Sequence, residues 1–374
     1  MTRVLAVLLA LLVSRSALAE APPAPELAAK TWLLLDATSG QRLASRDPEE
    51  RIEPASLTKL MTAYIAFSAL RQKTLHPAQS VAVSERAWHA AGSRMFIEPR
   101  KPVTVDELLR GAIVQSGNDA CIALAEAIAG SESAFVERMN REAARIGMTA
   151  THFTNATGMP DAGHYSTASD LALLASTLIR DFPEYYKLYS EREYRYNDIT
   201  QLNRNRLLWL DPNVDGMKTG HTGSAGYCLI ASARRGERRL VSVLIGASTE
   251  RQRTEESQKL LNFGFQAYEG FRLYPKDREI AKLPVWKGRE KILRAGVPAD
   301  LYVTVPRGTV DTLHAELVSE QPLLAPLAAG QRVATLRVTL EGKPFGEYPV
   351  VALESVATAG FFQRAWDGLA LWFK

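Results

Sequence analysis

The stretch Ser56-Leu57-Thr58-Lys59-Leu60-Met61-Thr62 carries the strongest indication of how this chain folds. An α-helix turns once in 3.6 residues, so Ser56 and Lys59 would lie on one face with side chains close enough to meet. A lysine placed there can remove the proton of the serine hydroxyl if burial or a neighbouring cation lowers its pKa. The following residues are mostly apolar as far as Ala69, which predicts a mostly buried helix with Ser56 in its first turn. A Ser-x-x-Lys pair by itself is more often part of a solvated helix face.

A second polar motif, Ser116-Gly117-Asn118, lies between two apolar helical runs, residues 108–114 and 120–128. Serine, glycine and asparagine all favour turns and helix caps, so an isolated motif of this kind usually marks a turn. Between two buried helices, however, a short polar corner can direct side chains into a cleft.

A third motif, Lys218-Thr219-Gly220, precedes two strand-like runs, residues 226–233 and 239–247. The motif is therefore predicted on a strand or at its end. Its glycine indicates the close approach of another backbone or of a ligand. In isolation the motif is more often a hairpin strand with a polar outer face, but the joint occurrence of three such motifs in this order is rare by chance.

The three motifs together resemble those of the low-molecular-mass penicillin-binding proteins, the serine-type D-alanyl-D-alanine carboxypeptidases of the S11 kind. Longer stretches resemble that family too, from Ser56 to Thr62, from Ser116 to Ala120 and from Val214 to Thr222. The similarity extends from about Ala29 to the end of the chain. It implies an enzyme that removes the terminal D-alanine from peptidoglycan pentapeptides through an acyl-enzyme, and that β-lactams acylate and inhibit.

The resemblance also implies roles for individual residues. Ser56 would attack the carbonyl between the two terminal D-alanines, with Lys59 as its base. Ser116 and Lys218 would relay a proton to the leaving D-alanine, and Asn118 would hold the peptide amide.

Further residues would bind the substrate, again by resemblance. The backbone N–H groups of Ser56 and His221 would form the oxyanion hole. Thr219, beside Gly220, would hydrogen-bond the terminal carboxylate of the substrate, and Lys218, Arg204 and Arg253 are the candidates for the positive field that this carboxylate needs. The residues around the two arginines leave both readings open, since each arginine could equally be a solvated surface charge.

Other functional classes receive less support from the composition. The six histidines are scattered and form no metal-binding motif, so no metal and no cofactor are expected. The formal net charge of +4 is mild and no basic stripe accompanies it, which argues against nucleic-acid binding.

Three alternatives to the carboxypeptidase remain open: a D,D-endopeptidase, a weak β-lactamase and a non-catalytic cell-wall-binding protein. Class A β-lactamases need a glutamate to activate the deacylating water. No glutamate occurs between Glu142 and Glu184, where its counterpart would be expected. Release of a bound β-lactam is therefore expected to be slow. The presence of both Ser56 and Lys59 argues against a pure binder.

Both ends of the chain carry membrane-related signals. A basic start, an apolar run from Val4 to Val13 and the ending Ala17-Leu18-Ala19 are typical of a cleaved signal peptide. From Phe361 onward, aromatic and apolar residues recur with helical spacing, which predicts an amphipathic helix lying in the membrane interface. The expected location is the periplasmic side of the inner membrane, with the protein bound peripherally.

The predicted fold class is α+β: an antiparallel sheet assembled from both ends of the first domain around a helical insert, followed by a small all-β domain. The predicted segments are a signal peptide (1–19), a leader (20–28), a serine peptidase domain (29–272), a small β domain (273–357) and an amphipathic helix (358–374). Cys121 and Cys228 both lie in apolar runs and are predicted to be buried free thiols.

Overall fold

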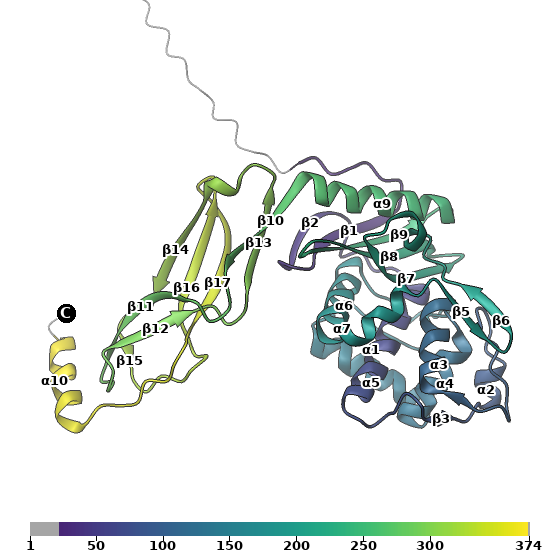
Figure 1. The fold of residues 1–374 in the computed structure, drawn as a ribbon, viewed down its shortest axis with the longest axis horizontal. Coiled ribbons are helices and arrows are strands. Elements are labelled where there is room, and N and C mark those ends of the chain that lie inside the picture. Colours follow the sequence, from purple (N-terminus) through teal and green to yellow (C-terminus); the bar gives the residue numbers. More distant parts are fainter. Residues whose placement is uncertain (1–21, 373–374) are drawn as a thin grey trace, which may run out of the picture. The chain divides into compact units, whose positions relative to one another are not determined.

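The structure is a computed structural model that describes residues 22–372 (Figure 1). The predicted signal peptide and the first two residues of the leader lie outside the described residues. The chain forms two compact units. One comprises Ala24–Gly270 with Tyr302–Thr304, and the other comprises Phe271–Leu301 together with the chain from Val305 onward. Each unit is described separately below.

The first unit is built on a five-stranded sheet in the order β2-β1-β9-β8-β7. Strands β1 (Thr31–Asp36) and β2 (Gln41–Arg46) come from the start of the unit. Strands β7 (Val214–Thr222), β8 (Gly226–Arg235) and β9 (Arg238–Ala247) come from its end. All neighbouring strands pair antiparallel. The prediction of an antiparallel sheet assembled from both ends of the domain is confirmed.

Successive residues of β1 point to opposite faces of the sheet, and each face is covered. Leu33 packs in the larger core, between the sheet and the helical block, whereas Leu34 packs in the smaller core beneath α9 (Glu250–Ala267). Figure 1 shows α9 on one side of the sheet and the helical block on the other. Helix α9 begins directly after Thr249, whose side chain caps it by accepting the N–H of Gln252.

The helical block contains the first two motifs. The 3₁₀ turn Ala55–Thr58 leads into α1 (Lys59–Arg71), a helix in which almost every side chain is buried. Helix α3 (Val105–Arg110) continues as one π-helical turn over Gly111–Gln115 and is followed by α4 (Asn118–Ala129). The remaining helices of the block are α2 (Glu85–Trp88), α5 (Glu132–Ile146), α6 (Ala168–Asp181), α7 (Pro183–Tyr186) and α8 (Leu207–Leu210), with a 3₁₀ turn at Lys187–Ser190.

Two short antiparallel ribbons complete the first unit. Strands β3 (Ser80–Val81) and β4 (Val103–Thr104) flank the segment that carries α2. Strands β5 (Glu193–Tyr196) and β6 (Ile199–Leu202) form a hairpin before α8.

The second unit is β-rich, as predicted. Its six-stranded sheet has the order β14-β16-β17-β12-β11-β15. The strands are β11 (Glu279–Trp286), β12 (Ile292–Gly296), β14 (Leu313–Ser319), β15 (Leu323–Leu324), β16 (Arg332–Leu340) and β17 (Lys343–Ala352). Strands β10 (Tyr268–Tyr274) and β13 (Leu301–Pro306) contain the boundaries between the units, and a 3₁₀ turn spans Val310–Thr312.

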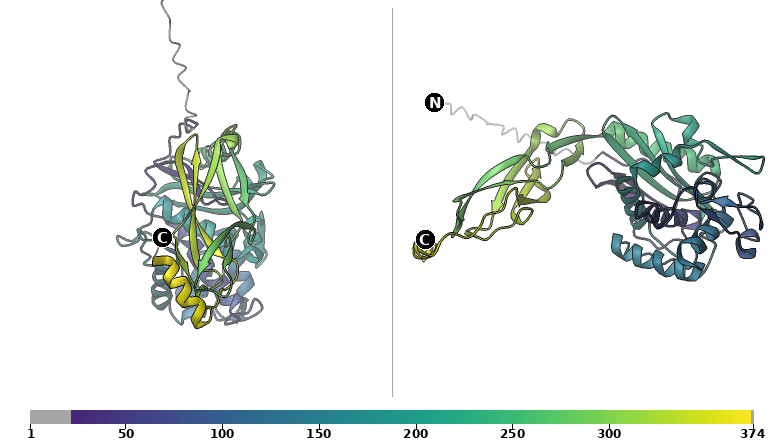
Figure 2. Two further views of the ribbon diagram at one scale, coloured as in Figure 1. Left: turned by 90° about the vertical axis from the view of Figure 1, so that its left-hand side faces the viewer. Right: turned by 60° about the horizontal axis from the view of Figure 1, so that its bottom comes forward.

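The last described element of the second unit is α10 (Phe361–Trp372), drawn in yellow in Figure 2. Its aromatic side chains are exposed, with Phe362 88% and Trp372 85% accessible. Across residues 22–372, no helix is both long enough and apolar enough to cross a membrane.

Candidate active site

Ser56 and Lys59 are in direct contact. Ser56 lies in the 3₁₀ turn, directly after Ala55, whose φ of +47° is left-handed and rare for a residue with a side chain. Such strained backbone is concentrated at functional sites. The Nζ atom of Lys59 lies 2.9 Å from the Oγ atom of Ser56 and donates a 2.5 Å hydrogen bond to the carbonyl of Thr157.

Burial changes the acid–base behaviour of Lys59. Its side chain is 2% exposed, and this desolvation lowers its pKa from 10.5 to about 8. The nearby Cys121 opposes the shift, while the positive charge of Arg204 adds to it. A lysine with a pKa near 8 is partly neutral at physiological pH and can act as a base towards Ser56.

Ser116 occupies the corner between the π-helical turn and α4. Its backbone is left-handed, with φ +66°, and the N–H of Gly117 closes the turn by donating to the carbonyl of Gly111. The Oγ atom of Ser116 is buried, and no group among residues 22–372 is its hydrogen-bond partner. A buried hydroxyl without a partner is costly unless a ligand or water satisfies it. This hydroxyl is therefore available for proton transfer.

Asn118 begins α4 and is held by the loop that precedes it. Its backbone N–H donates to the carbonyl of Ser93 at 2.7 Å, and its side-chain amide donates to the carbonyl of Ala91 at 2.6 Å. Its Oδ1 atom is buried without a partner in the described part of the chain. The side chain thus keeps one hydrogen-bond acceptor that a ligand could use.

The third motif lies on β7, next to the turn that contains Ser56. A Cβ atom at Gly220 would stand 3.3 Å from Ala55 Cβ, from the Pro54 carbonyl oxygen and from the Ser56 nitrogen. The close approach predicted from this glycine is therefore present, and it is the turn of Ser56 that approaches. Thr219 is buried, with 6% exposed.

Lys218 is as deeply buried as Lys59. Its Nζ atom donates to the carbonyl of Thr219 at 3.0 Å. Desolvation lowers its pKa well below the usual range, and the positive charges of Lys59 and then Arg204 lower it further. Because the charge of Lys59 acts on Lys218, the two side chains belong to one site, and a lysine whose pKa is lowered can take part in proton transfer.

The two candidate arginines differ in environment. Arg204 is exposed, yet its charge reaches both lysines. Arg253 is 4% exposed, and its Nη2 atom donates to the carbonyl of Arg204 at 3.3 Å and to Glu250 at 3.1 Å. The ring of Tyr227 lies 5.7 Å from the Arg253 guanidinium, and burial lowers the pKa of this group. Arg253 is thus a buried cation rather than a solvated surface charge.

His221 follows Gly220 at the end of β7. Its side chain is exposed, and its ring centroid lies 4.1 Å from that of Tyr227. This contact places His221 on the same side of the sheet edge as Tyr227, the residue that also faces the guanidinium of Arg253.

Sequence reasoning missed the residues that support the motifs. Asp119 is buried, and its carboxylate accepts the N–H groups of Met95, Phe96 and Ile97 at 3.0, 2.8 and 3.3 Å. An aspartate in the first turn of a helix is a recognisable signal for N–H capping, but its partners here belong to a distant loop.

His164 supports the turn that contains Ser56. The N–H of Thr154 donates to its Nδ1 atom at 3.0 Å, so the proton is on Nε2, which donates to the hydroxyl of Thr58 at 2.7 Å. Burial lowers the pKa of His164 to about 4, so the ring is neutral at physiological pH. No sequence signal connects His164 with Thr58, because more than a hundred positions separate them.

Two further features are the state of the cysteines and the distribution of possible metal ligands. Cys121 and Cys228 are buried and free, as predicted. Within the described part of the chain, no three histidine, cysteine or acidic side chains gather at one point where they could hold a metal ion.

Two family models match successive parts of this chain. Residues 17–249 match the family model described as D-alanyl-D-alanine carboxypeptidase, and residues 268–358 match the model of the penicillin-binding protein 5 C-terminal domain. The D-alanyl-D-alanine carboxypeptidase DacC of Escherichia coli is 42% identical over 94% of this chain and 90% of its own length.

Solved structures agree with the sequence comparison. Penicillin-binding protein 5 from Haemophilus influenzae is 40% identical, covers 90% of this chain and 99% of its own, and superposes with a TM-score of 0.86. Penicillin-binding protein D2 from Listeria monocytogenes, solved in an ampicillin-bound form, is 29% identical, covers 65% of this chain and 100% of its own, and has a TM-score of 0.61.

Proposed function

The chain belongs to the D-alanyl-D-alanine carboxypeptidase family, peptidase S11, and is a serine-type enzyme of that family; from this we propose how its own residues carry out the reaction. Ser56 Oγ attacks the carbonyl carbon of the penultimate D-alanine while Lys59 Nζ takes the hydroxyl proton. The tetrahedral intermediate then loses the terminal D-alanine, and the C–N bond breaks. Water hydrolyses the remaining ester and regenerates Ser56.

One observation carries this proposal: Lys59 Nζ lies 2.9 Å from Ser56 Oγ and has a pKa lowered to about 8. Both requirements of general-base catalysis, contact with the proton and a pKa near the working pH, are thus met by one residue. Departure of the D-alanine needs a proton on its amine. The unpartnered hydroxyl of Ser116, with Lys218 behind it, supports the assignment of this relay.

We assign substrate binding to the edge of β7 and to the start of α4. The free Oδ1 atom of Asn118 would accept the peptide N–H, and Thr219 would donate to the terminal carboxylate. The buried Arg253 and the exposed Arg204 would supply the positive field for that carboxylate. The backbone N–H groups of Ser56 and His221 would hold the oxyanion. Gly220 permits this arrangement, since a Cβ atom there would crowd the turn of Ser56.

The same chemistry supports acylation by β-lactams. The ampicillin-bound relative shows that a protein with this fold accepts a penicillin. A β-lactam presents a strained amide to Ser56, and ring opening leaves an ester on the serine. Because the interval between Glu142 and Glu184 contains no glutamate to activate a water, the adduct should be released slowly.

We further propose that α10 binds the membrane surface from the periplasmic side. Its exposed aromatic side chains suit the boundary between headgroups and acyl chains. Asp367 lies on the opposite side of the helix and is held by Lys291 Nζ at 2.7 Å and by the N–H of Lys287 at 2.6 Å. Gln363 adds a 3.0 Å bond to the carbonyl of Gly288. These bonds turn the aromatic stripe outward before any lipid is met.

The test uses the signal-free chain and a penicillin. Intact-protein mass should show one stable adduct that is absent in Ser56→Ala, and a peptide ending in D-Ala-D-Ala should release free D-alanine. An adduct without D-alanine release, with cleavage of a cross-linked dimer instead, would establish the endopeptidase. Rapid loss of the adduct with an opened lactam would establish a β-lactamase, and no adduct at all would refute the role of Ser56.

A further inference from the structure

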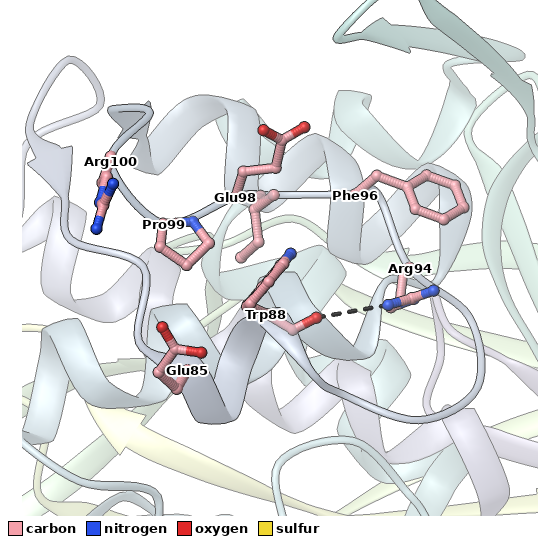
Figure 3. Close-up of a pocket in the computed structure, with 8 residues that line it drawn as sticks. Glu85, Trp88, Arg94, Phe96, Glu98, Pro99 and Arg100 are labelled. Atoms are coloured by element: carbon pink, nitrogen blue, oxygen red, sulfur yellow. Dashed lines mark hydrogen bonds between the residues drawn. The ribbon is translucent and has the colours of Figure 1, made fainter.

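A pocket of about 480 Å³ lies in the segment between β3 and β4 (Figure 3). Six of its lining residues carry charge or an aromatic ring: Glu85, Trp88, Arg94, Phe96, Glu98 and Arg100. None of these residues belongs to the three motifs, and the reaction described above uses none of them.

Opposite charges border this pocket without neutralising each other. Among residues 22–372, neither arginine forms an ion pair with either glutamate. Glu98 pairs instead with Lys101 at 2.8 Å, and Glu85 lies 3.4 Å from the ring of His89. Arg100 is exposed and free of hydrogen-bond or ion-pair partners within the described chain. Arg94 makes one long bond, 3.5 Å to the carbonyl of Trp88.

Both aromatic walls of the pocket are accessible to solvent. Trp88 is 37% exposed and Phe96 is 39% exposed. Figure 3 shows Trp88 in the middle of the pocket, with Arg94 and Phe96 on one side and Arg100 on the other. Phe96 and Arg100 have φ values of +69° and +70°. Left-handed backbone is costly for such large side chains and persists where the surroundings enforce it, which is characteristic of binding sites.

The loop behind the pocket is attached to the catalytic motif. Asp119 accepts the N–H groups of Phe96 and Ile97, and Asn118 donates to Ser93, one residue before Arg94. From the other side, Gln201 Nε2 donates to the carbonyl of Arg94 at 3.2 Å. The pocket is therefore a rigid extension of the motif that holds the substrate amide.

We propose that this pocket binds the zwitterionic side chain of a diamino acid in the peptide substrate, a side chain that ends in both an ammonium and a carboxylate. The carboxylate would be held by Arg94 and Arg100, the ammonium by Glu85 and Glu98, and the methylene chain would lie on Trp88. This inference rests on the proposed function, since it concerns the upstream part of the same peptide. A ligand with both charges is complementary to the charged walls of the pocket. A ligand with only a negative charge would be repelled by the glutamates, and one with only a positive charge by the arginines.

The test compares three peptides that end in D-Ala-D-Ala and differ only at the diamino acid. They carry diaminopimelate (both charges), lysine (ammonium only) or Nε-acetyl-lysine (neither charge). We expect kcat/KM for D-alanine release at low salt to be about tenfold higher for the first than for the third, as one charge-assisted contact contributes roughly that factor. The quantity measured is the ratio between peptides on one enzyme preparation, so it does not depend on the active fraction.

Two variants assign the charges. Arg100→Gln should reduce the ratio of diaminopimelate to lysine, and Glu85→Gln should reduce the ratio of lysine to acetyl-lysine. Arg251→Gln, which removes an exposed arginine on α9, is the matched control and should change neither ratio. The proposal is overturned if the wild type treats the three peptides alike within twofold, or if both variants keep its ratios. Failure of the proposed function would look different: no penicillin adduct, and no D-alanine from any of the peptides.

Discussion

The lowered pKa of Lys59 predicts a particular pH dependence of acylation. With a pKa of about 8, about a tenth of Lys59 is neutral at pH 7 and half at pH 8, against about 0.03% at pH 7 for an unperturbed lysine. Burial therefore increases the concentration of the base form about 300-fold at neutral pH. The second-order rate constant of penicillin acylation should rise about tenfold from pH 6 to pH 7 and level off above about pH 8.

The lowered pKa of Lys59 also makes the stability of the fold depend on pH. Because the folded-state pKa of Lys59 lies below its unfolded value of 10.5, the unfolded state holds more protons between about pH 8 and pH 10.5. This lysine therefore costs the fold about 3 kcal/mol below pH 8, and the cost disappears as the pH rises through that window. Lys59→Met should remove the cost, raise the Tm at pH 7 and lower acylation by about 10²–10⁴.

The assay is stopped-flow or quenched acylation between pH 5.5 and pH 9.5, followed by intact mass, with thermal melts of the same samples. Lys282→Met, which removes a lysine that is 66% exposed, is the matched control and should alter neither quantity. Three results would refute the reasoning: an acylation rate constant that does not change with pH, one that rises only near pH 10, or a Lys59→Met variant in which the rise of the wild type persists.

Three further predictions separate catalysis, support and membrane binding. Ser116→Ala should leave the Tm within about 1 °C, because the lost hydroxyl has no partner in the described chain, while D-alanine release falls about 100-fold in a turnover assay. Asp119→Asn should cost about 1–3 kcal/mol in urea unfolding, since the N–H groups of Met95, Phe96 and Ile97 lose a charged acceptor; an unchanged midpoint would contradict this. Asp367→Asn should weaken co-sedimentation with anionic vesicles several-fold, because an undocked helix of this length is marginal in water; Glu347→Gln, which breaks an exposed ion pair in the same unit, should not.

Much of this molecule could be predicted from local patterns. Lys218-Thr219-Gly220 lies on a strand as predicted, α1 is buried as its apolar run indicated, and α10 begins at the predicted Phe361. The spacing of Ser56 and Lys59 was sufficient to predict their contact. Each of these inferences depends on a period of two or of 3.6 residues, which a short window of sequence contains in full.

Other features depended on the tertiary structure. Lys59 is held by the carbonyl of Thr157, 98 positions away, and its lowered pKa follows from the burial that this packing creates. Arg204 and Arg253 looked alike in the sequence, yet one is exposed and the other is buried.

The sequence by itself determined which groups are present, their order along the chain and the periodicity of the elements that carry them. Only the tertiary structure decided which distant backbone groups those side chains meet and how much water remains around them. The pocket at Trp88 shows the same division, since its charges are visible in the sequence but their lack of mutual pairing is not. The physical reason is that desolvation and hydrogen bonding depend on neighbours in space, and chain folding brings those neighbours from any position in the sequence.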